Sequence, residues 1–401
     1  MHMDFAERVT RVEPSATIAI SNLAAKLEAD GVDVVDLSVG EPDFDTPENI
    51  KQAAREAMDA GETGYTPSSG IPSLKNAIVE KLHADGLTQY ETENVMVTPG
   101  GKQALYEVFQ SVIDGGDEVV LLDPAWVSYE AMVKLAGGSL KRVDTAAHDF
   151  DLEPALDDFA ATVSDNTELL VVNSPGNPHG SVYSETAFEG VRDLAVEHDF
   201  AVISDEIYKE ITYDGREAIS LGTLDGMADR TITLNGFSKA YAMTGWRLGY
   251  FAGPEELLEE AGKLQSHSVT CAVNFVQHAG VEALRNTDES VEEMRAAFEE
   301  RRDMLVDLFA EYGKEIPVPE GAFYVMLPVD DDDSEAQRAS EQPSGDKPRD
   351  QAWAEEAVEE AAVATVPGSP FGTPGYVRLS YAASQDRLRE GVERLAEADL
   401  L

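Results

Sequence analysis

Cysteine is almost absent from this chain of 401 residues, which has Cys271 alone. A single cysteine excludes an intrachain disulfide and is typical of proteins in a reducing compartment. No stretch approaches the roughly 20 consecutive apolar residues that a membrane-spanning helix needs. The first residues, 1–5, lack the charged-then-apolar pattern of a secretory signal. These absences favour a cytoplasmic protein with no membrane partner.

Basic residues are also scarce: the chain has 30 Lys and Arg against 77 Asp and Glu, a net charge of −47. Nucleic-acid binding needs a basic face, and an anionic membrane attracts basic segments, so this balance argues against both partners. An acidic excess of this size repels itself at low ionic strength and is tolerated where salt screens it. We therefore expect a halophilic protein from a salty cytoplasm, rather than an ordinary acidic protein of a mesophile.

The most informative stretch is 235–250, which reads NGFSKAYAMTGWRLGY. The apolar, β-branched run 230–234 before it predicts a buried strand, so Lys239 lies just past the carboxyl end of that strand, where α/β sheets bind ligands. A desolvated lysine amine loses its proton readily and can form a Schiff base with an aldehyde. Arg247 is a fixed cation suited to a phosphate or carboxylate. This pairing points to pyridoxal phosphate; the alternative, a surface lysine and a salt-bridged arginine, leaves the Gly and Ser at these offsets unexplained.

The run 236–249 resembles the lysine signature of class I aminotransferases, and the similarity extends over almost the whole chain, above all to the prokaryotic aspartate/prephenate subgroup. The resemblance implies a pyridoxal-phosphate-dependent transferase of fold type I, an α/β protein. It implies an arm with part of a small domain over 1–46, a large cofactor domain with a mainly parallel sheet between helices over 47–285, and a small α+β domain over 286–401. The acidic composition of 329–352 predicts an exposed loop without regular structure.

Strand-plus-helix units alternate from about residue 47 to 270, which predicts a mainly parallel sheet with helices on both faces. Glycines at 100 and 101 separate the predicted strand 95–98 from a helix. Such a turn presents backbone N–H groups and the positive end of the helix to an anion, although a lone Gly-Gly is usually only a turn. The resemblance implies that the cofactor phosphate is held by Gly100, Gly101, Lys102, Ser238, Arg247 and, from a second chain, Tyr65.

Three further candidates follow predicted strands and suit the cofactor ring. Trp126 can stack on a flat ring, although core packing is an equal alternative on sequence grounds. The carboxylate of Asp205 can keep a ring nitrogen protonated, so that the ring accepts electrons, and Tyr208 can donate to a ring oxygen. The resemblance implies these roles and adds Asn177, which would bind both the ring oxygen and the substrate carboxylate. His179 replaces the usual Thr of this loop but spares the Asn.

An arginine, Arg378, stands alone in the otherwise apolar strand predicted over 375–381. Burying it is costly unless it is paired, and a bidentate bond to a carboxylate would justify the position; an edge-strand arginine facing water is the alternative. The resemblance implies that it grips the α-carboxylate of the substrate. The implied substrate contacts are Gly40, Lys102, Trp126, Asn177 and Arg378, with Ser15 and Thr17 nearby.

The resemblance implies an aminotransferase in which Lys239 holds the cofactor and then acts as general acid and base. The expected substrates are aspartate or glutamate with 2-oxoglutarate or oxaloacetate, and Lys102 is the candidate for the side-chain carboxylate. Glu13 stands where prephenate-using relatives carry a basic residue, which argues against prephenate. The alternatives are an aromatic or broad-range aminotransferase, a β-lyase or a ligand sensor. A homodimer with shared active sites and no metal is expected.

Overall fold

The computed structural model describes residues 4–13, 16–329 and 347–401. Its largest sheet has seven strands: β2 (Val95–Thr98), β3 (Glu118–Asp123), β4 (Ser139–Asp144), β5 (Thr167–Asn173), β6 (Ala201–Asp205), β7 (Thr231–Gly236) and β8 (Gly249–Ala252). They lie in the order β2-β8-β7-β6-β5-β3-β4. Neighbours run parallel except at β8, which is antiparallel to both β2 and β7. The prediction of a mainly parallel sheet is confirmed.

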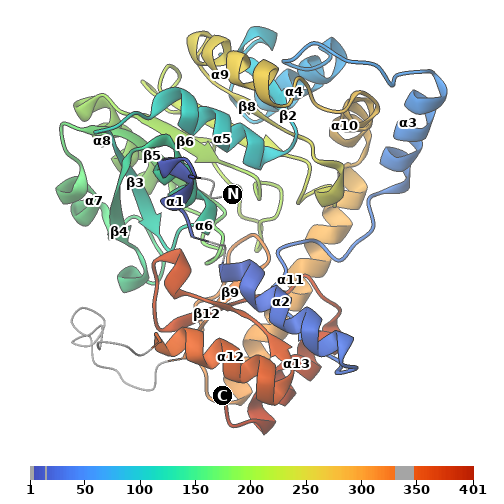
Figure 1. Cartoon of the computed structure of the whole chain (residues 1–401), viewed down its shortest axis with the longest axis vertical. Coiled ribbons are helices and arrows are strands. Elements are labelled where there is room, and N and C mark those ends of the chain that lie inside the picture. The colour runs from blue at the N-terminus through green and yellow to red at the C-terminus, as the bar shows by residue number, and fades with distance from the viewer. Residues whose placement is uncertain (1–3, 14–15, 330–346) are drawn as a thin grey trace.

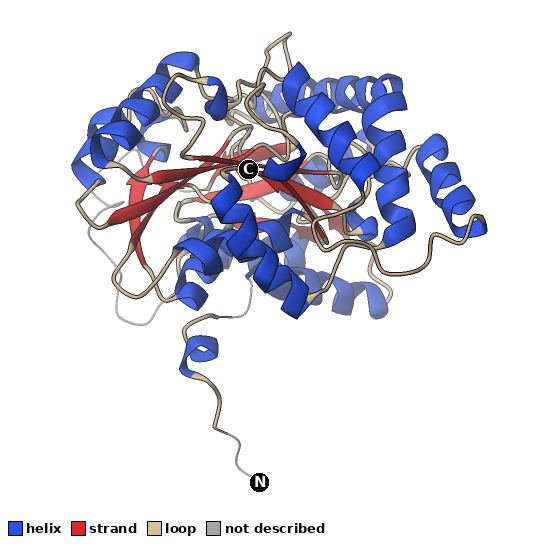
Figure 2. Ribbon diagram, turned by 90° about the horizontal axis from the view of Figure 1, so that it is seen from above, coloured by secondary structure: helices blue, strands red, loops and turns tan. Residues whose placement is uncertain are grey.

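Helices cover both faces of this sheet, as Figure 2 shows. They are α3 (Glu48–Asp59), α4 (Pro72–Ala84), α5 (Gly101–Val112), α6 (Val127–Ala136), α7 (Leu156–Thr162), α8 (Glu185–His198), α9 (Glu255–Ser268) and α10 (Asn274–Asn286). Successive side chains of a strand point to opposite faces. In β5, Leu169 and Val171 join a buried cluster with α5, α6 and α9, whereas Leu170 and Val172 join one with α7 and α8. Strands buried on both faces read as continuous apolar runs, which is why the sequence reveals them.

Two smaller sheets lie below the large one in Figure 1. Their strands are β1 (Val35–Asp36), β9 (Tyr324–Pro328), β10 (Val363–Ala364), β11 (Val366–Pro367) and β12 (Tyr376–Ser380). Strands β11, β12 and β9 form an antiparallel sheet, and β1 pairs in parallel with β10. The remaining α-helices are α1 (Glu7–Thr10), α2 (Ala16–Ala29), α11 (Asp288–Glu311), α12 (Arg349–Ala361) and α13 (Gln385–Glu397). No helix in the described part of the chain is long and apolar enough to cross a membrane. The division of the chain at residues 46 and 285 stays a prediction.

The acidic segment 329–352 differs from its expectation in part. Residues 330–346 lie outside the described residues, but α12 begins at Arg349 and is helical where a loop was expected. The buried carboxylate of Asp350 accepts hydrogen bonds from the N–H and the hydroxyl of Ser369 at 2.7 and 2.6 Å. An acidic residue therefore fixes the first turn of this helix, and the composition alone does not distinguish it from the solvated acids before it.

Two strands of the large sheet, β4 and β8, are not predicted from the sequence. The residues of β4, Ser-Leu-Lys-Arg-Val-Asp, are mostly exposed or half-buried because the strand lies at the edge of the sheet, so no apolar run marks it. Strand β8 has only four residues and follows the lysine loop directly. Strand β1 is short, because only Val35 and Asp36 pair with β10.

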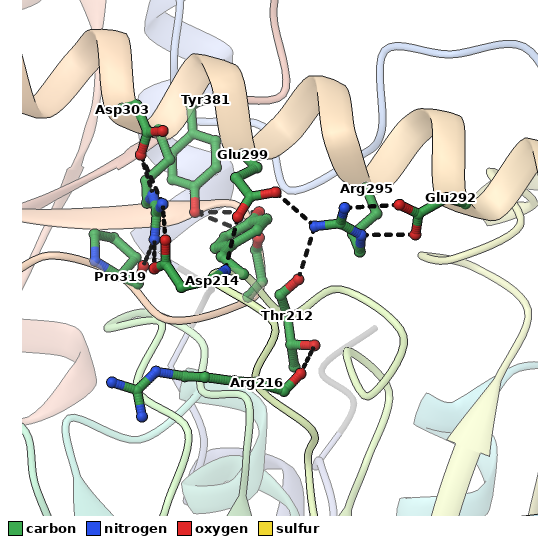
Figure 3. Close-up of polar contacts among 12 residues, drawn as sticks. Thr212, Asp214, Arg216, Glu292, Arg295, Glu299, Asp303, Pro319 and Tyr381 are labelled. Carbon is green, nitrogen blue, oxygen red and sulfur yellow. Dashed lines mark hydrogen bonds and ion pairs between the residues drawn. The ribbon is translucent and has the colours of Figure 1, made fainter.

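Helix α11 is tied by charged side chains to the segment that follows β6 (Figure 3). The buried guanidinium of Arg302 donates to both carboxylate oxygens of Asp214, at 2.7 and 3.2 Å. Arg295 donates to the carbonyl of Thr212 at 3.2 Å, and Glu299 accepts from the backbone N–H of Asp214 at 2.7 Å. This network anchors a segment whose first residues belong to the cavity described next.

Candidate active site

A cavity of about 330 Å³ opens at the carboxyl ends of the central parallel strands, and residues of β9 and β12 complete its wall. Most of the predicted site residues meet there. Those that line it are Gly40, Gly101, Lys102, Trp126, Asn177, Asp205, Tyr208, Ser238, Lys239, Arg247 and Arg378. Gly100 lies at its edge, because a Cβ on this residue would stand 2.7 Å from the guanidinium of Arg247.

Lys239 lies in the loop that leaves β7, and its amine donates to the carbonyl oxygen of Gly40 at 2.7 Å. Burial lowers the pKa of this amine from 10.5 to about 8, against the opposing effect of the Glu41 carboxylate. A larger fraction of the amine is therefore neutral near pH 7 than for an ordinary lysine. A neutral amine is the nucleophilic and basic form that imine chemistry needs.

Asp205, the last residue of β6, is buried, and its Oδ2 accepts a hydrogen bond from the phenol of Tyr129 at 2.7 Å. Burial raises the pKa of this carboxyl from 3.8 to about 6, while the bond from Tyr129 acts in the opposite direction. A nearby cation would favour the charged form of this carboxyl. The phenol of Tyr208, three residues further along the chain, pairs with that of Tyr324 at 2.8 Å. Asp205 is thus suited to a protonated ring nitrogen.

The start of α5 forms an anion cradle. Gly100 precedes the helix at φ +91°, a conformation that favours glycine, and a Cβ on Gly249 would come within 2.4 Å of the Gly101 nitrogen. Arg247 and Lys102 line the same cavity, and neither has a carboxylate within ion-pair distance among the described residues. Unpaired cations beside a helix N-terminus, in a chain of net charge −47, fit a phosphate.

Arg378 is 3% exposed, so the alternative of an arginine facing water does not hold. Its two Nη atoms donate to Asn177 Oδ1 at 3.1 Å and to the carbonyl of Ser38 at 2.6 Å, whereas its Nε has no partner among the described atoms. The ring of Tyr324 lies 4.5 Å from the guanidinium carbon. Burial lowers the pKa of this guanidinium. A buried arginine paired only with neutral oxygens fits a carboxylate ligand.

The Lys102 amine lies 4.6 Å from the centre of the Trp126 ring, in cation–π geometry. Burial first, and then the charge of Arg247, lower the pKa of Lys102. Trp126 in turn meets the edge of Tyr129 at 5.4 Å and 85°. Lys102 is therefore a further cation of the cavity, besides Arg247 and Arg378.

Tyr65 is not brought to this cavity: it is 90% exposed on a loop before α4. Its predicted contact needs a second chain and stays a prediction. Ser15 lies outside the described residues, as does the side chain of Thr17, so their predicted roles stay predictions too.

Several lining residues were missed by the sequence analysis: Glu41, Tyr129, Asn173, Thr244 and Tyr324. Tyr129 had a usable signal, since it follows Trp126 by three positions on a helix and so faces the same side. Asn173 ends the strand that precedes the Asn177 loop, and its Oδ1 accepts from the backbone N–H of Asn177 at 2.8 Å. Tyr324 gave no signal, because an aromatic residue in a buried strand reads as core.

The chain matches the model of the family "Aminotransferase class I and II" over residues 32–395. The aspartate/prephenate aminotransferase of Thermus thermophilus is 42% identical over 394 residues, covering 98% of this chain and 97% of that protein. The aspartate aminotransferase of Bacillus subtilis is 40% identical over 396 residues, with 98% of each covered. The chain belongs to the class I and II aminotransferases.

Solved structures agree with this assignment. The aspartate aminotransferase of Thermus thermophilus with maleate has a TM-score of 0.91 and 41% identity, covering 99% of this chain and all of that one. An aromatic aminotransferase from Pyrococcus horikoshii has a TM-score of 0.84 and 39% identity, covering 94% of this chain. The fold is that of the pyridoxal-phosphate-dependent transferases, and the protein is an aminotransferase that depends on pyridoxal phosphate.

Proposed function

We propose that this enzyme moves the amino group of an acidic L-amino acid, aspartate or glutamate, to 2-oxoglutarate or oxaloacetate. The observation that carries the proposal is the pair of cations without carboxylate partners, Arg378 and Lys102, that line one cavity. A dicarboxylic substrate offers two anionic ends, and one cation can bind each. The names of the relatives from Thermus thermophilus and Bacillus subtilis support this substrate class.

The residues fit the cofactor, and their roles follow from their positions. When bound, pyridoxal phosphate supplies an electron sink for the carbanion that forms at the substrate Cα. With the cofactor bound, the Lys239 amine would be the group that accepts the proton of the substrate Cα and later donates it; its pKa of about 8 suits a group that must do both near neutral pH. Asp205 holds the proton on the ring nitrogen, and Tyr208 donates to the ring oxygen.

The remaining residues bind and orient. Gly100, Gly101, Ser238 and Arg247 hold the phosphate, with Lys102 beside them. Arg378 and Asn177 together hold the α-carboxylate; their mutual hydrogen bond of 3.1 Å keeps the two groups aligned. Gly40 bounds the substrate space because a Cβ there would stand 2.6 Å from the Tyr324 hydroxyl, and Trp126 covers the ring face.

A second candidate is an aromatic or broad-range aminotransferase. The cavity walls include the rings of Trp126, Tyr208 and Tyr324, and a similar structure is an aromatic aminotransferase. Aromatic donors would leave the Lys102 amine without an anionic partner. Prephenate is disfavoured by the carboxylate at Glu13, although several relatives are named for it.

The proposal includes a cytoplasmic homodimer adapted to salt. Tyr65 is 90% exposed on its own chain, which suits a residue that completes the site of a partner. The net charge of −47 supports the salt requirement.

A half-reaction tests the substrate class. The purified holoenzyme in high salt is mixed with one amino acid at a time, and the absorbance of the bound cofactor is followed. Aspartate and glutamate should convert the cofactor to its amino form rapidly. Lys102→Met should raise the KM for these two donors by about 10- to 100-fold more than the KM for alanine, since it removes one charge-assisted bond to the side-chain carboxylate. Conversion by aromatic amino acids alone would refute the acidic-substrate proposal.

A further inference from the structure

The rings of Tyr183, His179, Phe150 and Tyr376 contact one another in a continuous row. Tyr183 and His179 stack at 6.0 Å and 22°, and His179 stacks on Phe150 at 5.8 Å and 18°. Phe150 then meets Tyr376 edge-on at 5.4 Å and 71°. Phe150, His179 and Tyr183 are each at most 5% exposed. The row therefore links a loop after β5, a turn near residue 150 and strand β12 through buried contacts.

The row reaches both residues that are proposed to hold the substrate α-carboxylate. His179 follows Asn177 by two positions, and Tyr376 precedes Arg378 by two positions on β12. Asn177 and Arg378 come from distant parts of the chain and share one direct hydrogen bond, of 3.1 Å. The ring of Phe150 lies between the two neighbours. The contacts of Phe150 with His179 and Tyr376 therefore join the segments that carry Asn177 and Arg378 a second time, besides their direct hydrogen bond.

The His179 ring, which lies between Tyr183 and Phe150, is fixed by its own loop. Its Nδ1 accepts a hydrogen bond from the backbone N–H of Ser181 at 3.1 Å, and its ring lies so close to the loop that a Cβ on Gly176 would come within 2.2 Å of it. Burial lowers the pKa of this imidazole from 6.5 to about 3, so the ring stays neutral over the working range. A neutral ring between two aromatic faces has no charge to solvate, which suits a structural spacer.

We propose that Phe150, His179 and Tyr376 are positioning residues for the substrate α-carboxylate, which set the distance between Asn177 and Arg378. The inference rests on the proposed function in one respect: Arg378 and Asn177 must bind that carboxylate. All three residues act through their neighbours and touch no substrate. Because every amino acid carries an α-carboxylate, their effect extends to all donors, whereas that of Lys102 is confined to acidic ones.

The test uses the holoenzyme with Phe150→Leu and, as the matched control, Phe159→Leu. Phe159 is also fully buried, but it lies on α7 and its ring contact is with Phe200, at 6.3 Å, rather than with a ring of the row. Loss of the central ring should raise the KM for aspartate, alanine and the 2-oxo acid alike by about three- to tenfold, with kcat within about twofold, the size expected for one aromatic pair. The control should leave each KM unchanged.

A titration with maleate, monitored through the absorbance of the bound cofactor, measures the affinity for a carboxylate without turnover. This affinity can be compared between variants even if the proposed donor class is wrong. The maleate Kd should rise by the same factor in Phe150→Leu. In the double variant Phe150→Leu/His179→Leu the maleate Kd should rise by less than the product of the two single increases, because both substitutions disrupt the same ring contact. Should Phe150→Leu fail to fold, Tyr376→Leu replaces it, at the half-buried end of the row, and should likewise weaken maleate binding. An unchanged maleate Kd, or equal losses in Phe159→Leu, would overturn the inference.

Discussion

We predict that the hydrogen bond from Tyr129 to Asp205 strengthens the binding of pyridoxal phosphate with a protonated ring nitrogen. Asp205 must be ionised to attract that nitrogen, and burial has already raised its pKa to about 6. The Tyr129 phenol favours the ionised form through a hydrogen bond of 2.7 Å. Tyr129→Phe removes this donor from a buried carboxylate, and hydrogen bonds to charged groups contribute about 1.5–3 kcal/mol.

The expected result follows from the sign of the shift. A carboxyl whose pKa is raised in the folded protein is neutral below that pKa, so cofactor affinity should fall as the pH drops through about 6. Without Tyr129 the pKa of Asp205 rises further, and the fall in affinity should begin at a higher pH. At pH 7 the Kd for pyridoxal phosphate should rise by about 2- to 15-fold, because loss of this bond lowers the fraction of Asp205 that is ionised.

Equilibrium titration of the apoenzyme with pyridoxal phosphate, across pH 5 to 8, measures both quantities. The cofactor phosphate itself titrates near pH 6, so the comparison is made between variants. Tyr90→Phe is the matched control, because Tyr90 is a buried tyrosine that donates to the Thr231 carbonyl at 3.0 Å away from the cavity. If Tyr129→Phe and Tyr90→Phe give the same pH profile as the parent, the role given to Tyr129 is refuted.

Three further predictions follow from the same structure. Lys239→Ala should lower turnover by at least about 1,000-fold while the protein stays folded, and turnover within tenfold of the parent would contradict its role in proton transfer. Arg378→Lys should raise the KM of every amino donor by about 10- to 100-fold, since lysine cannot donate two parallel bonds; steady-state kinetics with aspartate and alanine measure this, and an effect on one donor only would count against it. Dialysis to low salt should lower Tm because charge repulsion is no longer screened, and a Tm independent of salt from 0.05 to 2 M would exclude the proposed adaptation.

The sequence predicts the framework of this protein well where burial dictates composition. Strands such as β5 and β6 are covered on both faces, so their central residues are apolar; β6 ends at Asp205, and the Asn177 loop follows β5. Strand β4 at the edge of the sheet carries no such constraint and leaves no signal. The helical first turn of α12 is hidden for the converse reason, because its Asp350 is buried yet reads as part of a solvated acidic run.

The residues of the candidate site likewise fall into those that the sequence predicts and those that it does not. Lys239 and Arg247 are unusual residues for their positions, so their chemistry identifies them, whereas the glycines at the start of α5 become informative only together with these two cations. Tyr129 and Tyr324 are ordinary core residues by composition, and only the hydrogen bonds of their hydroxyls, to Asp205 and Tyr208, give them a place in the cavity. These hydrogen bonds join residues that are distant in the sequence, and such tertiary contacts cannot be predicted from one sequence alone.

The residues proposed to bind the cofactor and those proposed to bind the substrate α-carboxylate come together at different stages of folding. The phosphate cradle and the ring-binding residues lie between residues 100 and 247, so they can assemble on one sheet through its own strand pairings. The α-carboxylate site joins Ser38 to Arg378 across 340 positions, and β1 finds its only strand partner, among the described strands, in β10. Contacts so distant in sequence form late in folding. During synthesis the chain can therefore acquire its cofactor surface well before it can recognise a substrate.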